Sequence, residues 1–335
     1  MTIKKIVLAC VTFGLIGAFT APAQAADKVK IAMVAKSLGN GFFDAAHEGA
    51  EEAAKQLGDV QIIYTGPTTA TAEGQIEIIN SLISQKVAAI MISANDANAL
   101  VPITKKAMQR GIKVISFDSG IAKDGRLMQL NPSNAELIGL KQIQMASDAM
   151  GPAGGDVAIL SATAQATNQN IWIGEMKKAL AKPEFAKLKL VATVYGDDQS
   201  DKSYREAIGL LRSNPNLKVI IAPTTVGINA AGKAVADEKL VGKVYVTGLG
   251  LPSEMAGHVK SGAVKSFAIW NPIDLGYAAT YAAYDFVKGK ASGKAGESVD
   301  VGRMGKLTLD AGTEAALAPP FTYNKDNVDK FAKIF

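Results

Sequence analysis

The stretch "KIAMVAKSLGNGFFDAAHEGAEEAAKQLG", residues 30–58, begins as an apolar strand and ends as a helix rich in alanine and glutamate. A strand that leads into a helix in this way is typical of a parallel sheet covered by helices on both faces. Between the two elements the chain places Lys36, Asn40 and the adjacent rings of Phe42 and Phe43. A charge and two rings at the end of an apolar strand raise the possibility of a binding site there.

The same alternation of strand and helix continues along the chain. Between the apolar runs lie stretches with helical periodicity, such as 72–85, where Ile76, Ile79 and Leu82 fall on one face together with Ile83. This order predicts an α/β fold of doubly wound, parallel sheets. The runs rich in β-branched residues that we predict as strands are 29–35, 60–66, 88–94, 113–118, 156–162, 188–196, 217–223, 243–250 and 263–270.

Two parts of the chain repeat one order of elements. Residues 60–100 and 190–230 both read as strand, glycine-containing polar loop, helix, strand and polar loop. The chain has 335 residues, and single hydrophobic cores stop growing near about 250 to 300 residues. Two α/β domains are therefore expected.

The first 25 residues have the pattern of a secretory signal peptide. Lys4 and Lys5 precede an apolar run, 6–20, which is followed by the small-residue cleavage site Ala23-Gln24-Ala25. The run is too short for a spanning helix, which needs about 20 apolar residues. We therefore expect cleavage after Ala25 and export of the remaining chain.

Charge and cysteine content narrow the class of protein further. Removal of residues 1–25 takes away two lysines and no acidic residue, so the formal net charge of +5 becomes +3. This mild charge, without a basic stripe, argues against nucleic-acid binding. The single cysteine, Cys10, lies in the predicted signal peptide, so we expect neither disulfide nor thiol chemistry in the exported chain.

Open parallel sheets bind ligands beyond the carboxyl ends of their strands. The side chains that follow the predicted strands are mostly aromatic or neutral hydrogen-bonding groups. A carboxylate accepts hydrogen bonds from hydroxyls, amides both donate and accept, and flat rings cover C–H faces, so this set suits a small polyhydroxylated ligand. The candidate ligand-binding residues are Lys36, Asn40, Phe42, Phe43, Ser93, Asn95, Asp118, Ser119, Asn168, Gln169, Asn170, Thr224, Thr225, Trp270 and Asn271.

Each candidate also has a purely structural interpretation. Phe43 fits a core position in the first turn of a helix, and Asp118 fits a turn or a helix cap. Trp270 fits packing at a hinge, and Asn168 and Thr224 fit helix N-caps. The binding interpretation is favoured because all of these residues occur at the same topological place.

Signals for catalysis, cofactors and metals are weak. Gly39-x-Gly41 resembles half of a dinucleotide-binding motif, but Asp44 occupies the position of the third glycine. The chain has no phosphate-binding loop of the Walker type and no G-x-S-x-G motif. The two histidines, His47 and His258, lack metal-site spacing. We therefore expect no enzyme activity, no cofactor and no metal.

Several longer stretches carry a resemblance to a known family: "KSLGNGFFDAA", "AMQRGIKVISFDS", "ATNQNIWI", "VIIAPTTVGI" and "TGLGLPSEMAGHVKSGAVKSFAIWNPIDLG". The chain resembles the type I periplasmic sugar-binding proteins of ABC transporters, in the ribose-binding group. Within that group it is most similar to rhamnose-binding and autoinducer-2 binding proteins. The resemblance implies two α/β lobes joined by a three-crossing hinge, with a sugar held between them.

The implied N-terminal lobe comprises 26–131 plus 271–304, and the implied C-terminal lobe comprises 132–270 plus 305–335. The implied site includes the asparagine and phenylalanine pair at Asn40, Phe42 and Phe43, and the aspartate at Asp118. A lysine at the position of Lys36 is shared with autoinducer-2 binders.

Two positions favour rhamnose over autoinducer-2. Autoinducer-2 binders carry an Asp-Gln pair and a Pro-x-Ala, where this chain has Asn168-Gln169 and Pro223-Thr224-Thr225.

Another position argues against ribose as the ligand. Ribose binders place an aspartate near Leu249 and Gly250, where this chain is apolar enough to receive the methyl group of a deoxy sugar.

The expected protein is therefore a monomeric, periplasmic receptor that closes on rhamnose or a similar deoxy sugar and delivers it to a membrane permease, with a chemoreceptor as a second candidate partner. Three alternatives stay open. They are an autoinducer-2 receptor, a transcription regulator of the same fold, which would carry an N-terminal helix-turn-helix, and a periplasmic enzyme, which would need a nucleophile or a metal.

Overall fold

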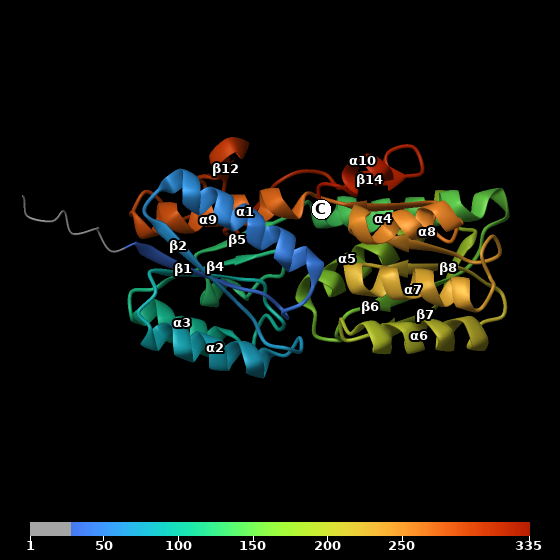
Figure 1. Ribbon diagram of the computed structural model, residues 1–335, viewed down its shortest axis with the longest axis horizontal. Coiled ribbons are helices and arrows are strands. Elements are labelled where there is room, and N and C mark those ends of the chain that lie inside the picture. Colours follow the sequence, from blue (N-terminus) through green and yellow to red (C-terminus); the bar gives the residue numbers. More distant parts are fainter. Residues whose placement is uncertain (1–27) are drawn as a thin grey trace, which may run out of the picture.

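The computed structural model describes residues 28–335, which form two α/β lobes side by side (Figure 1). The predicted signal peptide, 1–25, lies outside the described residues. No helix within 28–335 has both the length and the apolar character needed to cross a membrane.

The N-terminal lobe is built on a six-stranded sheet in the order β13-β5-β4-β3-β1-β2, with every neighbouring pair parallel. Helices α1 (Gly41–Leu57) and α9 (Pro272–Val287) cover one face, and α2 (Ala72–Ser84) and α3 (Val101–Gln109) cover the other (Figure 1). The strands are β1 (Val29–Val34), β2 (Val60–Thr65), β3 (Ala89–Ile92), β4 (Lys113–Phe117), β5 (Met128–Asn131) and β13 (Glu314–Ala316).

The C-terminal lobe is built on a four-stranded parallel sheet in the order β7-β6-β8-β9. Bridges from Val246 to Val264 and from Leu249 to Ala268 connect it to β10, which pairs antiparallel with β14. Helices α4 and α5 pack together, as do α6 and α7. The strands are β6 (Gly155–Ser161), β7 (Leu188–Tyr195), β8 (Leu217–Ala222), β9 (Tyr245–Gly248), β10 (Ser266–Ile269) and β14 (Phe321–Asn324). The helices are α4 (Ala135–Met150), α5 (Thr167–Leu180), α6 (Ser200–Ser213), α7 (Thr225–Asp237), α8 (Pro252–Ser261) and α10 (Val328–Phe331).

The central strand β1 illustrates how an apolar run forms a strand in a sheet that helices cover on both faces. Its residues from Ile31 to Val34, and the following Ala35, are all fully buried. Successive side chains of a strand point to opposite faces, so burial of every one requires helices on both faces. All nine predicted strands are confirmed, as is the predicted helix at 72–85, which spans Ala72–Ser84.

Helix α1 is held against α9 by two glycines. A Cβ atom on Gly49 would lie 1.8 Å from the carbonyl oxygen of Ile273, and one on Gly276 would lie 1.8 Å from that of Ala46. Only glycine allows the two backbones to approach this closely. The contact fixes the N-terminal end of α1, which carries residues of the site, relative to the start of α9.

Three crossings connect the lobes. The chain passes from β5 to α4 at 132–134, from β10 to α9 at 270–271, and from β13 to β14 at 317–320. The first and third crossings run side by side, because Leu317 N donates to Asn131 O at 3.1 Å and Ala318 N donates to Pro132 O at 3.2 Å. This arrangement is the three-crossing hinge that the resemblance implied.

The region before the third crossing differs from the predicted lobe boundary. Strands β11 (Ser298–Asp300) and β12 (Lys306–Thr308) form a hairpin beside α9, and β13 pairs with β5 in the N-terminal sheet. The prediction assigned all of 305–335 to the C-terminal lobe, whereas residues 306–316 lie with the N-terminal lobe. The physical reason is that β13 covers the edge of β5, which would otherwise leave its backbone groups unpaired.

Candidate functional site

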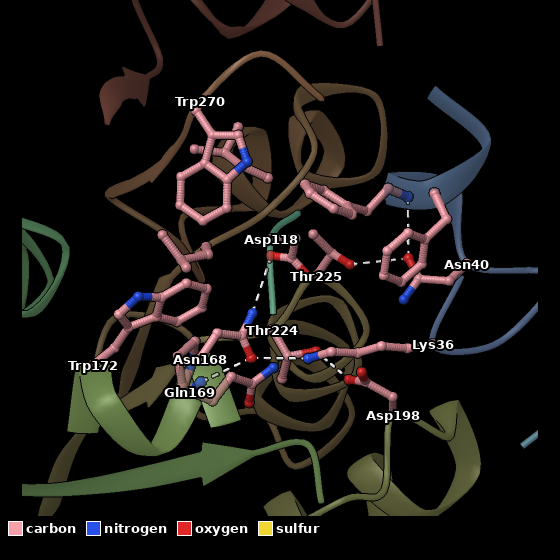
Figure 2. A pocket seen from close by; sticks show the side chains of 15 residues that line it. Lys36, Asn40, Asp118, Asn168, Gln169, Trp172, Asp198, Thr224, Thr225 and Trp270 are labelled. Carbon is pink, nitrogen blue, oxygen red and sulfur yellow. Dashed lines mark hydrogen bonds between the residues drawn. The ribbon is translucent and has the colours of Figure 1, made fainter. Parts of the chain in front are cut away.

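The carboxyl ends of the strands from both lobes meet at one cavity, which we call the inner cavity (Figure 2). Residues after β1 and β4 approach from the N-terminal lobe, and residues after β6, β7, β8, β9 and β10 approach from the C-terminal lobe. Its volume is about 40 Å³. The lining residues are Lys36, Asn40, Phe42, Phe43, Asp118, Asn168, Gln169, Trp172, Asp198, Pro223, Thr224, Thr225, Leu249, Ile269 and Trp270.

Asn168 connects the two lobes through its side-chain amide. Lys36 Nζ donates to Asn168 Oδ1 at 2.8 Å, and Asn168 Nδ2 donates to Asp118 Oδ1 at 3.0 Å. Lys36 and Asp118 belong to the N-terminal lobe, and Asn168 begins helix α5 of the C-terminal lobe. In addition, Thr225 Oγ1 donates to Asn40 Oδ1 at 3.4 Å across the same gap. The lobes are therefore closed on each other.

Asp118 is fixed by its backbone and by its partners. It follows β4 with φ of 58°, a left-handed conformation that turns its carboxylate into the cavity. Ser93 Oγ donates to its Oδ2 at 2.7 Å. Burial raises the pKa of Asp118, and the nearby charge of Lys36 opposes that rise. The carboxylate is thus held in a dry setting where each hydrogen bond to it matters.

Aromatic rings form another part of the wall. Phe42 meets Phe43 edge to face with centroids 5.2 Å apart, and it meets Trp270 at 6.2 Å. Trp172 from α5 lies 5.6 Å from Trp270. Phe43 also contacts Phe117 of β4, so it serves both the core and the wall. Within the described residues, the buried Trp270 Nε1 has no hydrogen-bond partner.

The sequence reasoning missed Asp198. Its side chain points toward Lys36 from the turn after β7, and it accepts a hydrogen bond from the hydroxyl of Thr224 (Figure 2). Desolvation raises the pKa of Asp198, and Lys36 opposes the rise. Asp197 and Asp198 both have positive φ, of 55° and 51°. Two such residues in succession are uncommon outside glycine and are typical of functional turns.

A signal for Asp198 was present in the sequence. It lies two residues after the predicted strand 188–196, and ligands bind beyond the carboxyl ends of such strands. Trp172, Pro223, Leu249 and Ile269 also line the inner cavity, and Leu249 stood at the position predicted to receive a methyl group. Trp172 could not be found from strand ends because it lies one turn inside α5.

Ten of the fifteen predicted residues line the inner cavity, and the other five lie elsewhere. Ser93 and Ser119 are buried behind the wall, where they hydrogen-bond Asp118 Oδ2 and the backbone N of Asn168. Asn95 Nδ2 donates to Lys36 O at 2.9 Å. Asn170 is exposed and donates to Ala164 O, and Asn271 caps α9 by accepting from Ile273 N.

A buried glutamine supports the loops of the N-terminal lobe. Gln75 of α2 is fully buried, and its Nε2 donates to Ala35 O at 3.0 Å and to Ser93 O at 2.7 Å. Its Oε1 accepts from Asn95 N at 2.9 Å. The Gln75 side chain thus joins the carboxyl ends of β1 and β3. Lys36 follows β1, and Ser93, which donates a hydrogen bond to Asp118, follows β3.

The chemistry of the inner cavity is that of recognition by hydrogen bonds and rings. It combines one amine, two carboxylates, amides and hydroxyls with aromatic and aliphatic surface. Among residues 28–335, no three His, Cys, Asp or Glu side chains are grouped so that they could hold a metal ion. One water molecule needs about 10 to 15 Å³ of such cavity volume, so about 40 Å³ leaves room for a few water molecules. A ligand that takes hydrogen bonds from Lys36, Asn168 and Asp118 would exchange the cross-lobe bonds of Asn168 for its own.

Comparison with known proteins places these features in a family. The D-allose-binding periplasmic protein of Escherichia coli is 28% identical over 255 residues, which cover 73% of this chain and 80% of that protein. An ABC transporter solute binding protein from Clostridium phytofermentas, solved with bound L-rhamnose, is 38% identical with a TM-score of 0.88, and the match covers 93% of this chain and 100% of that one.

LsrB from Clostridium saccharobutylicum, solved in complex with AI-2, is 23% identical with a TM-score of 0.86 over 90% of this chain and 99% of that one, which shows a shared fold. The family described as "Periplasmic binding protein domain" matches residues 31–291. With its two α/β lobes, three crossings and interlobe cavity, the chain belongs to the periplasmic binding protein domain family.

Proposed function

We propose that this chain is the substrate-binding protein of an ABC sugar importer, and that it binds L-rhamnose or a similar deoxy sugar in the inner cavity. The observation that carries the proposal is the pairing, within one closed cavity, of hydrogen-bonding side chains from both lobes with rings of Phe42, Trp172 and Trp270. Such a set matches a ring that has hydroxyls at its edge and C–H groups on its faces.

Three features support a deoxy sugar within the class of sugars. Leu249 and Ile269 give the wall aliphatic surface that suits a methyl group. Asn168 stands where autoinducer-2 binders have an aspartate, so the site has an amide that both donates and accepts. The relative from Clostridium phytofermentas, 38% identical, was solved with L-rhamnose.

The mechanism is a clamp that works without chemical conversion of the sugar. The ring first binds one lobe and gains its second set of hydrogen bonds when the lobes close, so its binding energy shifts the population to the closed form. A permease in the membrane then reads the closed surface. The family supports a periplasmic location. We further propose that the protein is a monomer and that a chemoreceptor is a second candidate reader.

The test is calorimetric titration of the purified exported chain with L-rhamnose, D-ribose, D-allose and autoinducer-2. We expect L-rhamnose to bind at least about tenfold more tightly than D-ribose and D-allose, because these two sugars have no methyl group to meet Leu249 and Ile269. We also expect it to bind more tightly than autoinducer-2, because Asn168 stands in place of the aspartate of autoinducer-2 binders. Tighter binding of autoinducer-2 would favour the alternative receptor function, for which the shared lysine at Lys36 is the supporting feature. Release of a converted sugar would contradict the clamp.

A further inference from the structure

A second, larger cavity lies directly beside the inner cavity. This outer cavity has a volume of about 670 Å³, against about 40 Å³ for the inner one. The two cavities share Asp118, Asn168 and Trp172. A partition one side chain thick therefore separates them, and its polar part is the hydrogen bond from Asn168 Nδ2 to Asp118 Oδ1 at 3.0 Å.

We propose that the outer cavity is a second sugar subsite, so that the natural ligand is a glycoside or disaccharide whose terminal deoxy sugar occupies the inner cavity. This inference rests on the function proposed above and extends it to the substrate class. A ring that takes the hydrogen bonds of Asn168 and Asp118 in the inner cavity would release the bond between these two residues. The same exchange opens the partition, and a substituent on the ring then reaches the outer cavity.

The wall of the outer cavity has the mixed character that carbohydrate requires. Ile171, which is 50% exposed at the start of α5, and the neighbouring Trp172 supply apolar surface from the C-terminal lobe. Gln129 and Asn131 of β5 supply amides from the N-terminal lobe, with Gln129 Nε2 donating to Asn131 Oδ1 at 3.1 Å. Flat apolar surface opposite amides fits the face and the edge of a sugar ring.

Ser133 provides an unused polar group in the same wall. It lies in the first hinge crossing and is only 3% exposed, and its Oγ has no hydrogen-bond partner among residues 28–335. A buried hydroxyl without a partner costs free energy, which a ligand hydroxyl would recover once rotation of the Ser133 side chain turns Oγ toward the outer cavity. Because Ser133 sits between the lobes, a group bound to it also contacts the hinge.

The charges around the outer cavity favour a neutral occupant. The guanidinium of Arg126 is buried and already engaged, with Nη2 donating to Glu314 Oε1 at 2.7 Å and Nη1 donating to Thr313 O at 3.2 Å. Lys123 Nζ donates to Ala311 O at 2.7 Å. The wall also carries the carboxylates of Asp118, Asp310 and Glu314, so it holds charges of both signs and offers no cluster of one sign to attract an ionic ligand.

The experiment compares L-rhamnose with rhamnobiose, a disaccharide of two α-linked L-rhamnose units, by calorimetry on the full exported chain. We expect rhamnobiose to bind at least as tightly as L-rhamnose. Two single variants, Ile171→Ala and Ser133→Ala, should each weaken rhamnobiose by about three- to tenfold and change L-rhamnose by less than about twofold. Val241→Ala, at a 38% exposed position between α7 and β9, is the matched control and should change neither.

The outcomes separate this inference from the proposed function. Binding of L-rhamnose with rejection of rhamnobiose would overturn the second subsite and leave the proposed function intact. Rhamnobiose binding that neither variant weakens would also overturn it, because the second ring would then lie outside the outer cavity. Failure of both sugars to bind would contradict the proposed function and this inference together. Selective weakening of rhamnobiose would support the subsite.

Discussion

Lys36 of the N-terminal lobe and Asn168 of the C-terminal lobe are joined by a hydrogen bond of 2.8 Å between Nζ and Oδ1. The same amide donates to Asp118, so one side chain holds two residues of the opposite lobe. These bonds occupy groups that a sugar would need. Closure and sugar binding therefore use the same atoms, and replacement of cross-lobe bonds by ligand bonds is the exchange on which the clamp depends.

Removal of this amide should open the ligand-free protein. In Asn168→Ala the bonds to Lys36 and Asp118 are lost, so we expect a larger radius of gyration in solution X-ray scattering and about tenfold weaker binding of L-rhamnose. Asn80→Ala, at an exposed position on α2, is the control and should change neither quantity. An unchanged radius and affinity in Asn168→Ala would show that the amide does not hold the lobes.

Asp118 should contribute strongly to affinity. Asp118→Ala leaves Ser93 Oγ and Asn168 Nδ2 without their acceptor in a dry cavity, so we expect a loss of about 2 to 4 kcal/mol, or at least about tenfold, in L-rhamnose binding by calorimetry. Equal affinity of Asp118→Ala and the parent would contradict the assignment of the site.

Asp198 can be tested against its own neighbour. Asp198→Asn keeps the shape of the side chain but removes the charge that faces Lys36, and we expect L-rhamnose to bind about three- to tenfold more weakly. Asp197→Asn is the matched control, because Asp197 forms a surface ion pair with Lys202 and such pairs contribute little. If calorimetry finds the two variants equally affected, the effect belongs to the turn and not to the cavity.

The two buried carboxyls should make stability depend on pH in an unusual direction. Burial raises the pKa of Asp118 and of Asp198 above the ordinary value of 3.8, so between 3.8 and the raised pKa the folded protein binds more protons than the unfolded chain. The free energy of unfolding contributed by these groups therefore falls as the pH rises through that window, and it increases again on acidification.

This dependence is measured as the difference in melting temperature between the ligand-free parent and the double variant Asp118→Asn/Asp198→Asn. As the pH falls from about 7 to about 4, we expect the parent to gain stability relative to the variant, while its affinity for L-rhamnose falls because protonated carboxyls accept hydroxyls less well. A difference that stays constant across this range would contradict the raised pKa values.

The glycine contact between α1 and α9 should tolerate no side chain. In Gly49→Ala the new Cβ would meet Ile273 O, so the helices must separate and the free energy of unfolding should fall by about 1 to 3 kcal/mol in urea denaturation. Gly209→Ala is the matched control, because its Cβ meets nothing within 4 Å on α6 and alanine is the better helix former. A Gly49→Ala protein as stable as the control would show that the two helices can separate without cost.

The strands could be predicted wherever burial on both faces of a sheet requires a continuous run of apolar, β-branched residues. β1 and β8 are fully or almost fully buried along their apolar residues, so their β-branched runs stand out. β5, with the sequence MQLN, and β13, with EAA, carry no β-branched residue and take their strand form from pairing with each other and with β4. Their positions depend on tertiary contacts that no local pattern records.

Those site residues that directly follow a strand of the parallel sheets could be predicted from the sequence. The rule that ligands bind beyond strand ends located Lys36, Asp118 and Asn168, which meet in one cavity. It could not separate residues that face the cavity from those that hold them, because Asp118 and Ser119 both follow β4, yet Asp118 lines the cavity and Ser119 lies buried behind it. It also could not reveal the outer cavity, whose wall combines β5, the first crossing and residues 308–316.

The paired crossings at the hinge also limit how the molecule can move. Because Leu317 N and Ala318 N donate to Asn131 O and Pro132 O, the first and third crossings are tied to each other and should move together. The two lobes should then rotate about a single hinge axis and return to the same relative orientation each time they close. The surface that the closed lobes present to a partner would therefore be set by the hinge crossings, and it would not depend on which sugar is bound.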